Sequence, residues 1–139
     1  MKLLLSMAIA AATLLAADGA TYIAKEKVSE ALAKGGPLHS ASDLSVSGSH
    51  RTGPGQVEVH DKETDVMYVI DGHAVVVTGG KMVGGKSTKA GQWLGTDIQG
   101  GETHHLGKGD VLVVPAGTPH WFKEVPGPIS YYVVKVIRQ

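Results

Sequence analysis

The chain has 139 residues, a formal net charge of zero at neutral pH and no cysteine. This length allows one domain of ordinary size. Because the net charge is zero, the composition argues against electrostatic binding to nucleic acid. The missing thiols exclude disulfides, thiolate metal sites and a cysteine nucleophile. The 19 glycines, combined with many valines, indicate short strands joined by tight turns.

Residues 1–20, "MKLLLSMAIAAATLLAADGA", have the pattern of a secretory signal peptide. Lys2 is a brief basic region, and the apolar stretch that follows has roughly 15 residues, fewer than the roughly 20 that span a membrane. Small residues then offer cleavage sites. We expect a periplasmic or secreted protein without a stable membrane anchor, and an uncleaved N-terminal anchor is the alternative.

Residues 21–36 are predicted to form one short amphipathic helix. Ala24, Val28, Ala31 and Leu32 fall on one helical face, and lysines and glutamates occupy the other. Thr21 could cap the start, and the two glycines at 35–36 would end the helix. The mixed charges favour a helix packed on the domain over one that binds membranes.

From residue 40 onward the apolar pattern has a period of two, which is typical of strands. The segments "DLSVS", "GQVEVH", "DVMYVI", "HAVVVT", "DVLVV" and "SYYVVKVI" all fit it. Asp71-Gly72 between two apolar runs predicts a hairpin. Residues 78–101 are rich in glycine and predict a long loop, with a brief strand near 94–98. The fold class expected is all-β, an antiparallel sandwich or barrel.

Four side chains form the candidate site: Glu58, His60, Asp65 and His120. Residues two apart on a strand share a face, so Glu58 points inward if His60 does. A buried carboxylate beside an imidazole is costly unless it is satisfied, and a divalent cation would satisfy both. Asp65 begins the next strand and could place a second carboxylate beside Glu58 and His60. Alternatively, it could cap the turn after Lys62.

The segment "GDVLVVPAGTPH" resembles the second conserved motif of the cupin superfamily, through Gly109, Pro115, Gly117 and His120. Residues 55–72 are similar to a degraded first motif. Aligning on its last glycine, Gly72, puts Glu58 and His60 at the two histidine positions and Asp65 at the glutamate position. The resemblance spans roughly residues 43–137 and is strongest to small single-domain bacterial cupins.

This resemblance implies a jelly-roll β-barrel domain over residues 43–139, commonly dimeric, with the metal at its centre. Glu58, His60, Asp65 and His120 would be the metal ligands, and Asp65 could alternatively act as a catalytic general base. Two imidazoles with carboxylates suit Fe, Mn, Ni, Zn or Cu as divalent ions. The expected function is oxygenase, isomerase or lyase chemistry on a small polar molecule.

Two other functions are compatible with the same residues. One is a non-catalytic cupin that binds a small molecule or a metal, and the other is a structural dimer with a vestigial site. Fold alone does not choose among them, because one scaffold supports many chemistries. At most one of His104 and His105 can point inward, because neighbours on a strand face opposite ways.

The remaining histidines lack a motif and are expected at the surface or in turns: His39, His50 and His73. Five larger side chains could line a pocket mouth, with core packing as the preferred interpretation for the aromatic ones: Arg51, Tyr68, Trp93, Trp121 and Tyr132.

Strand patterning predicts a homodimer. In residues 65–70, Asp65, Met67 and Val69 share the pocket face, but the opposite face is also apolar. Residues 130–137 show the same two-sided pattern. A sheet face exposed to water normally carries polar residues, so a partner subunit is expected to cover this one.

Overall fold

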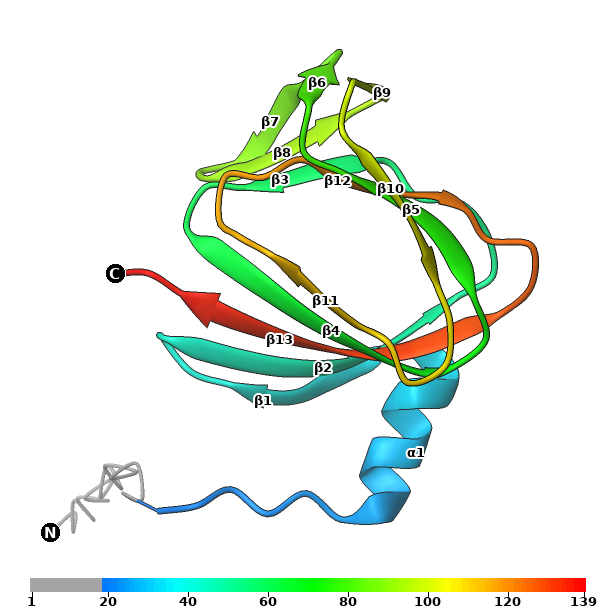
Figure 1. Ribbon diagram of the computed structural model, residues 1–139. Coiled ribbons are helices and arrows are strands. Elements are labelled where there is room, and N and C mark those ends of the chain that lie inside the picture. The colour runs from blue at the N-terminus through cyan, green and yellow to red at the C-terminus, as the bar shows by residue number, and fades with distance from the viewer. Residues whose placement is uncertain (1–18) are drawn as a thin grey trace, which may run out of the picture.

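The computed structural model describes residues 19–139, and the signal peptide predicted for residues 1–20 lies almost entirely outside them. The described chain forms one helix and thirteen strands, of which eleven form two facing antiparallel sheets (Figure 1). This confirms the all-β, jelly-roll expectation. None of the described helices is long and apolar enough to cross a membrane.

The first sheet has five strands, in the order β1-β2-β13-β4-β11. Their bounds are β1 Gly36–Ser40, β2 Leu44–Arg51, β13 Ile129–Ile137, β4 Glu63–Asp71 and β11 Val111–Val114. The second sheet has six strands, in the order β10-β5-β12-β3-β8-β7. Their bounds are β10 Glu102–Leu106, β5 Ala74–Thr78, β12 His120–Glu124, β3 Val57–His60, β8 Gln92–Gly95 and β7 Lys86–Lys89. A separate pair joins β6 Lys81–Val83 to β9 Asp97–Gln99.

The core lies between the two sheets and follows the period-two pattern of the strands. On β4 the inward side chains Asp65, Met67 and Val69 are all buried, as the sequence predicts. Phe122 of the second sheet stacks on Tyr131 of the first, with ring centroids 5.0 Å apart. The apolar contact between the sheets therefore begins directly beside Asp65.

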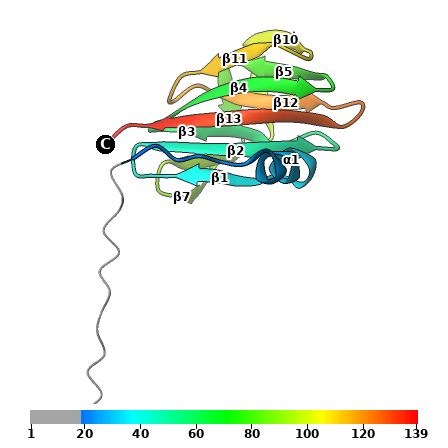
Figure 2. The same cartoon turned by 90° about the horizontal axis from the view of Figure 1, so that it is seen from below.

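Helix α1, Lys25–Lys34, packs on the outer face of the first sheet, against β2 (Figure 2). It begins later than expected, because Ala24 and not Thr21 is the N-cap residue, and no side chain caps it. Ala31 is its buried residue, and Gly48 of β2 lies beneath it. A Cβ added at Gly48 would lie 2.6 Å from the carbonyl carbon of Ala31, so the close approach depends on glycine.

The hairpin predicted at Asp71-Gly72 is wrong. Strands β4 and β5 belong to opposite sheets, and the segment between them carries the chain from one sheet to the other. Gly72 alone has a positive φ, 84°, whereas the predicted turn needs positive φ at both central residues. An added Cβ at Gly72 would also lie 2.2 Å from the carbonyl oxygen of Pro128, so the crossing is tight.

The long loop predicted for residues 78–101 is also wrong, although the brief strand expected near 94–98 does coincide with parts of β8 and β9. This stretch contains the four short strands β6, β7, β8 and β9, which form an edge of the second sheet and the separate pair. Strand β7 is exposed at every residue, so its sequence lacks an apolar face that would reveal it. A further strand that the sequence did not indicate is β1, which pairs with β2.

Candidate metal centre

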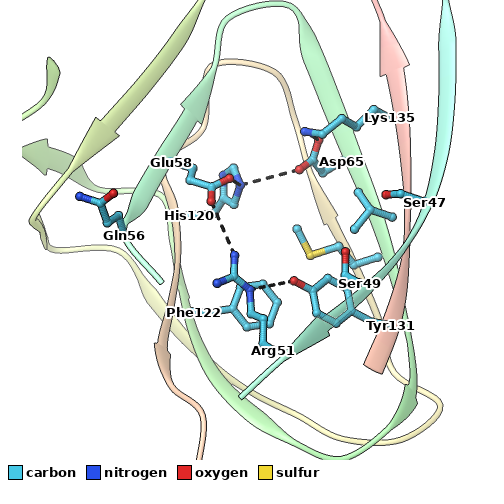
Figure 3. Close-up of a pocket in the computed structure, with 12 residues that line it drawn as sticks. Ser47, Ser49, Arg51, Gln56, Glu58, Asp65, His120, Phe122, Tyr131 and Lys135 are labelled. Atoms are coloured by element: carbon cyan, nitrogen blue, oxygen red, sulfur yellow. Dashed lines mark hydrogen bonds and ion pairs between the residues drawn. The ribbon is translucent and has the colours of Figure 1, made fainter. Parts of the chain in front are cut away.

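The four predicted site residues converge at one end of the space between the sheets. Figure 3 shows three of them, Glu58, Asp65 and His120. Glu58 and His60 come from β3, Asp65 from β4 and His120 from the start of β12. His60, Asp65 and His120 are the buried polar or charged residues of the described chain, at 9%, 3% and 3% exposure. Glu58 is partly buried beside them.

A Pro-Gly turn places His120. Gly117 adopts a φ of 81°, which is left-handed and favours glycine, and its backbone N–H donates to the carbonyl of His60 at 2.7 Å. Thr118 N donates to the carbonyl of Pro115 and closes the turn. The turn therefore ties the end of β3 directly to the start of β12 and brings the two imidazoles together, with ring centroids 5.1 Å apart.

Both imidazoles direct Nε2 at the same pair of carboxylates. His60 Nε2 lies 3.4 Å from Glu58 Oε2 and 3.6 Å from Asp65 Oδ2. His120 Nε2 lies 3.8 Å from the same Glu58 oxygen and 3.7 Å from the same Asp65 oxygen. His60 Nε2 is fully buried and has no hydrogen-bond partner in the described structure. An orphaned buried nitrogen of this kind is rare and requires an explanation.

The tautomers of the two histidines follow from their second nitrogens. His120 Nδ1 lies 3.2 Å from the carbonyl oxygen of Thr118, which can only accept, so Nδ1 carries the proton. His60 Nδ1 bonds to Oε1 of Gln92, whose amide Nε2 donates to Glu63 at 3.1 Å. In its neutral form each ring therefore presents a lone pair on Nε2, as metal-bound histidines do.

Three side chains that the sequence did not predict surround these four residues: Glu63, Gln92 and Lys135. Lys135 Nζ lies 2.8 Å from Asp65 Oδ1 and 2.9 Å from Glu63 Oε2. Asp65 does not cap the turn after Lys62; its Oδ1 binds Lys135, and its Oδ2 faces the imidazoles. A signal for Lys135 was present in the sequence, since a charged residue shares the inward parity of Tyr131 and Val133.

The charges in the cluster shift one another's pKa values. The neighbouring His60 lowers the pKa of Glu58 against the opposing effect of burial. Burial disfavours charge on His60, but the Glu58 carboxylate outweighs it and raises the pKa of His60. Burial lowers the pKa of His120. Burial also opposes charge on Lys135, but Asp65 and Glu63 overcome it and raise the pKa of Lys135.

Two overlapping sets of side chains in the described residues have metal-ligand spacing, with ligand atoms within 4.8 Å of one another. One is Glu58, His60 and His120, and the other is His60, Glu63 and Asp65. Both carboxylates of the second set already bind Lys135, so the first set has the freer ligands. A nitrogen-rich set with one carboxylate and no thiolate fits a first-row divalent metal.

Apart from Arg51, the remaining predicted positions do not line the cavity beside the cluster. His104 Nε2 bonds to Thr78 Oγ1 at 2.8 Å and His105 is exposed, so neither lines the cavity. His50 is part-buried and bonds to Ser130, contrary to the surface expectation. Among the aromatic positions, Tyr68 and Trp93 are exposed and do not pack in the core. Arg51 does line the cavity, but it is Tyr131 and not Tyr132 that joins it there.

Comparison with known proteins places this geometry in a wider context. A family model described as "Cupin" matches residues 37–134. No curated protein matches the chain.

Solved structures resemble the fold at low sequence identity. BH2720 from Bacillus halodurans has a TM-score of 0.54 and 16% identity, over 74% of this chain and 69% of that one. KdgF from a Halomonas species has a TM-score of 0.54 and 18% identity, over 75% and 79%. The DMSP lyase DddQ from Ruegeria pomeroyi has a TM-score of 0.50 and 19% identity, over 74% and 42%. At these identities the likeness concerns the fold alone.

Proposed function

The chain belongs to the cupin family, and from that premise we propose that it binds a divalent metal ion inside the barrel and acts there on a small polar molecule. Glu58, His60 and His120 would hold the ion. Asp65 would be a fourth ligand or a general base. The observation that carries this proposal is the pair of Nε2 lone pairs aimed at shared carboxylate oxygens, one of them buried without a partner.

A bound Fe, Mn, Ni, Zn or Cu ion would supply Lewis acidity, with positions left open for a ligand, and this suits oxygenase, isomerase or lyase chemistry. The protein's own contribution is positional. Gln92 and the Thr118 carbonyl orient the two imidazoles. Lys135 holds Asp65 with one oxygen toward the cluster, where that oxygen can accept a proton from a bound molecule.

Removing either imidazole tests the metal site. His60→Ala and His120→Ala should each weaken metal binding by more than the 10- to 100-fold typical of changes behind a ligand, since each removes a ligand itself. Elemental analysis of protein purified without a metal-affinity tag, followed by zinc titration, measures this. His105→Ala, at an exposed position outside the cavity, is the matched control. Wild-type zinc affinity in both variants would refute the site.

A second candidate function is supported by Lys135. Its ammonium group already forms ion pairs with two carboxylates of the cluster, so Asp65 and Glu63 each have a cationic partner without a metal. This favours a non-catalytic cupin that binds a small molecule in the same cavity. Absence of bound metal from the untagged wild-type protein, together with no measurable affinity for zinc, would select this alternative.

We also propose that the protein is exported and that residues 1–20 are removed. The support is the sequence pattern alone: a short apolar stretch after Lys2, followed by small residues. N-terminal sequencing of protein recovered from outside the cytoplasm of its host should find a start near Thr21. An intact Met1 on protein confined to the cytoplasm would contradict the proposal.

A further inference from the structure

A cavity of about 150 Å³ extends from the metal cluster between the two sheets (Figure 3). Since a water molecule takes up about 30 Å³, this space suits a ligand of only a few non-hydrogen atoms. Met67, Phe122 and Val133 form apolar walls. At the end away from Lys135, Arg51 and Tyr131 lie side by side (Figure 3).

The guanidinium of Arg51 is held in one orientation by contacts from different elements. Its Nε donates to the Tyr131 hydroxyl at 2.9 Å. Its central carbon lies 4.7 Å from the centre of the Phe122 ring, in a cation–π contact. One terminal nitrogen lies 3.6 Å from Glu58 Oε1. A guanidinium has five N–H donors, so this one is fixed in place yet keeps donors for a further partner.

Glu58 joins Arg51 to the metal cluster. Its Oε1 faces the guanidinium and its Oε2 faces both imidazoles. A ligand beside Glu58 can therefore reach Arg51 with one end and the metal position with the other. The second cation of the cavity, Lys135, is already matched by carboxylates at 2.8 and 2.9 Å. Arg51 has no carboxylate closer than 3.6 Å, so it is the cation available to an anion.

The charge balance favours an anionic ligand once a metal is bound. With neutral imidazoles, the cavity and cluster carry two cationic groups and three carboxylates: Arg51, Lys135, Glu58, Glu63 and Asp65. Their net charge is one negative, and a divalent ion changes it to one positive. In a poorly solvated space an uncompensated charge is costly, and one carboxylate from a ligand would neutralise it.

A second, more open groove borders the cavity and shares four of its lining residues: Ser47, Ser49, Arg51 and Tyr131. Arg51 therefore stands where the enclosed space meets the exterior. A small anion that enters from the groove would meet the guanidinium before it reached the metal.

We propose that Arg51, oriented by Tyr131, binds the carboxylate of a small anionic ligand whose other oxygen-bearing end contacts the metal. The inference rests on the proposed metal site and narrows its substrate class to small carboxylic acids. Arg51 supplies the planar fork of donors that matches a carboxylate. Tyr131 keeps its proton, because burial raises its pKa, and its hydroxyl hydrogen can serve the same anion.

The test uses zinc-loaded full-length protein and glycolate as the probe, with glycolamide as its neutral analogue. Calorimetric titration should show that Arg51→Gln weakens glycolate binding about tenfold or more, as expected for loss of a hydrogen bond to a charged group. Arg138→Gln, at the chain's exposed second arginine, should leave it unchanged. Glycolamide should bind weakly and equally to all three proteins.

Tyr131→Phe is a second test variant, to be used if Arg51→Gln does not fold. It keeps the buried ring and removes only the hydroxyl that orients Arg51. It should weaken glycolate binding severalfold at an unchanged unfolding temperature. Wild-type glycolate affinity in folded Arg51→Gln, or in Tyr131→Phe if the former does not fold, would overturn the inference.

Zinc affinity is measured separately for each protein by competition with a chelator. Zinc bound normally by wild-type protein that has no affinity for glycolate would overturn this inference and leave the metal site standing. Failure of the wild type to bind zinc would overturn the proposed function, and the bridging ligand with it.

Discussion

At the residue scale, Gln92 determines which nitrogen of His60 faces the carboxylates of Glu58 and Asp65. Its amide is itself oriented, because Nε2 donates to Glu63 and leaves Oε1 to accept from His60 Nδ1. The chain Glu63–Gln92–His60 thus fixes the imidazole from behind. Partners of this kind raise the basicity of a ligand and hold its ring in place.

Gln92→Met should weaken zinc binding about 10- to 100-fold, the usual cost of losing such a partner. Methionine keeps the side-chain length of Gln92 but lacks the amide oxygen that accepts from His60 Nδ1. The proton is then no longer held on that nitrogen. Gln99→Met, on the exposed end of β9, is the control. Zinc affinities are measured by chelator competition. If the affinities of Gln92→Met and the wild type agree within twofold, Gln92 does not position His60.

From the sequence alone, candidate metal ligands could be predicted where they belong to a motif or share a strand face with another candidate. His120 ends a motif, and Glu58 shares a strand face with His60. Gln92 could not be predicted, because its role depends on β8 pairing with β3, which places Gln92 opposite His60. That pairing joins residues more than 30 positions apart, through a segment whose sequence resembles a loop.

At the scale of elements, the contact of α1 with β2 depends on the absence of one side chain. Gly48 lets the backbone of Ala31 approach closely enough that an added Cβ would lie within 3 Å of three of its atoms. Two of these atoms are backbone, so the clash cannot be relieved by a side-chain rotation. The helix as a whole must move if Gly48 acquires a side chain.

Gly48→Ala should therefore lower the free energy of unfolding by about 1–3 kcal/mol, the usual cost of overpacking. Urea denaturation followed by circular dichroism measures this. Gly53→Ala is the matched control, since nothing lies within 4 Å of its added Cβ and its φ is not positive. Equal stabilities for the two variants would mean that α1 shifts without cost.

The strands with a clear period of two were predictable, and the order in which they pair was not. The face of each residue in β4 follows from alternation alone, and the structure confirms it. The short strands β6 to β9 lack a long enough pattern, and β7 has no buried residue to reveal one. Asp71-Gly72 resembles a hairpin locally, but a tight crossing between sheets uses the same turn residues.

At the scale of the whole molecule, the outer face of the first sheet is apolar beyond the part that α1 covers. Tyr132, Tyr68 and Val111 lie side by side in register across three strands, and Val134, Val66 and Val113 form the next row. Four apolar side chains there have exposures of 44–58%: Tyr68, Val111, Val113 and Val136. A contiguous patch of this kind on a soluble protein marks an interface.

We propose that a second copy of the chain covers this face and forms a homodimer through a self-complementary contact. Sedimentation equilibrium at micromolar concentration should give twice the monomer mass, and Val113→Lys should shift the protein to monomer. Tyr22→Lys, at a position with 89% exposure away from the sheet, should remain dimeric. If the wild type has the mass of a monomer, α1 and the loops are sufficient to cover the apolar outer face of the first sheet.

Strand β13 lies between β2 and β4, although it is synthesised after every other strand described. Until it emerges from the ribosome, β2 and β4 have no partner between them, and Asp65 lacks the ammonium group of Lys135. The central strand pairs of the first sheet therefore cannot form until residues 129–137 have been synthesised. For a protein that we propose crosses a membrane, this strand order would delay completion of the first sheet, and an incompletely folded polypeptide can pass through a narrow channel.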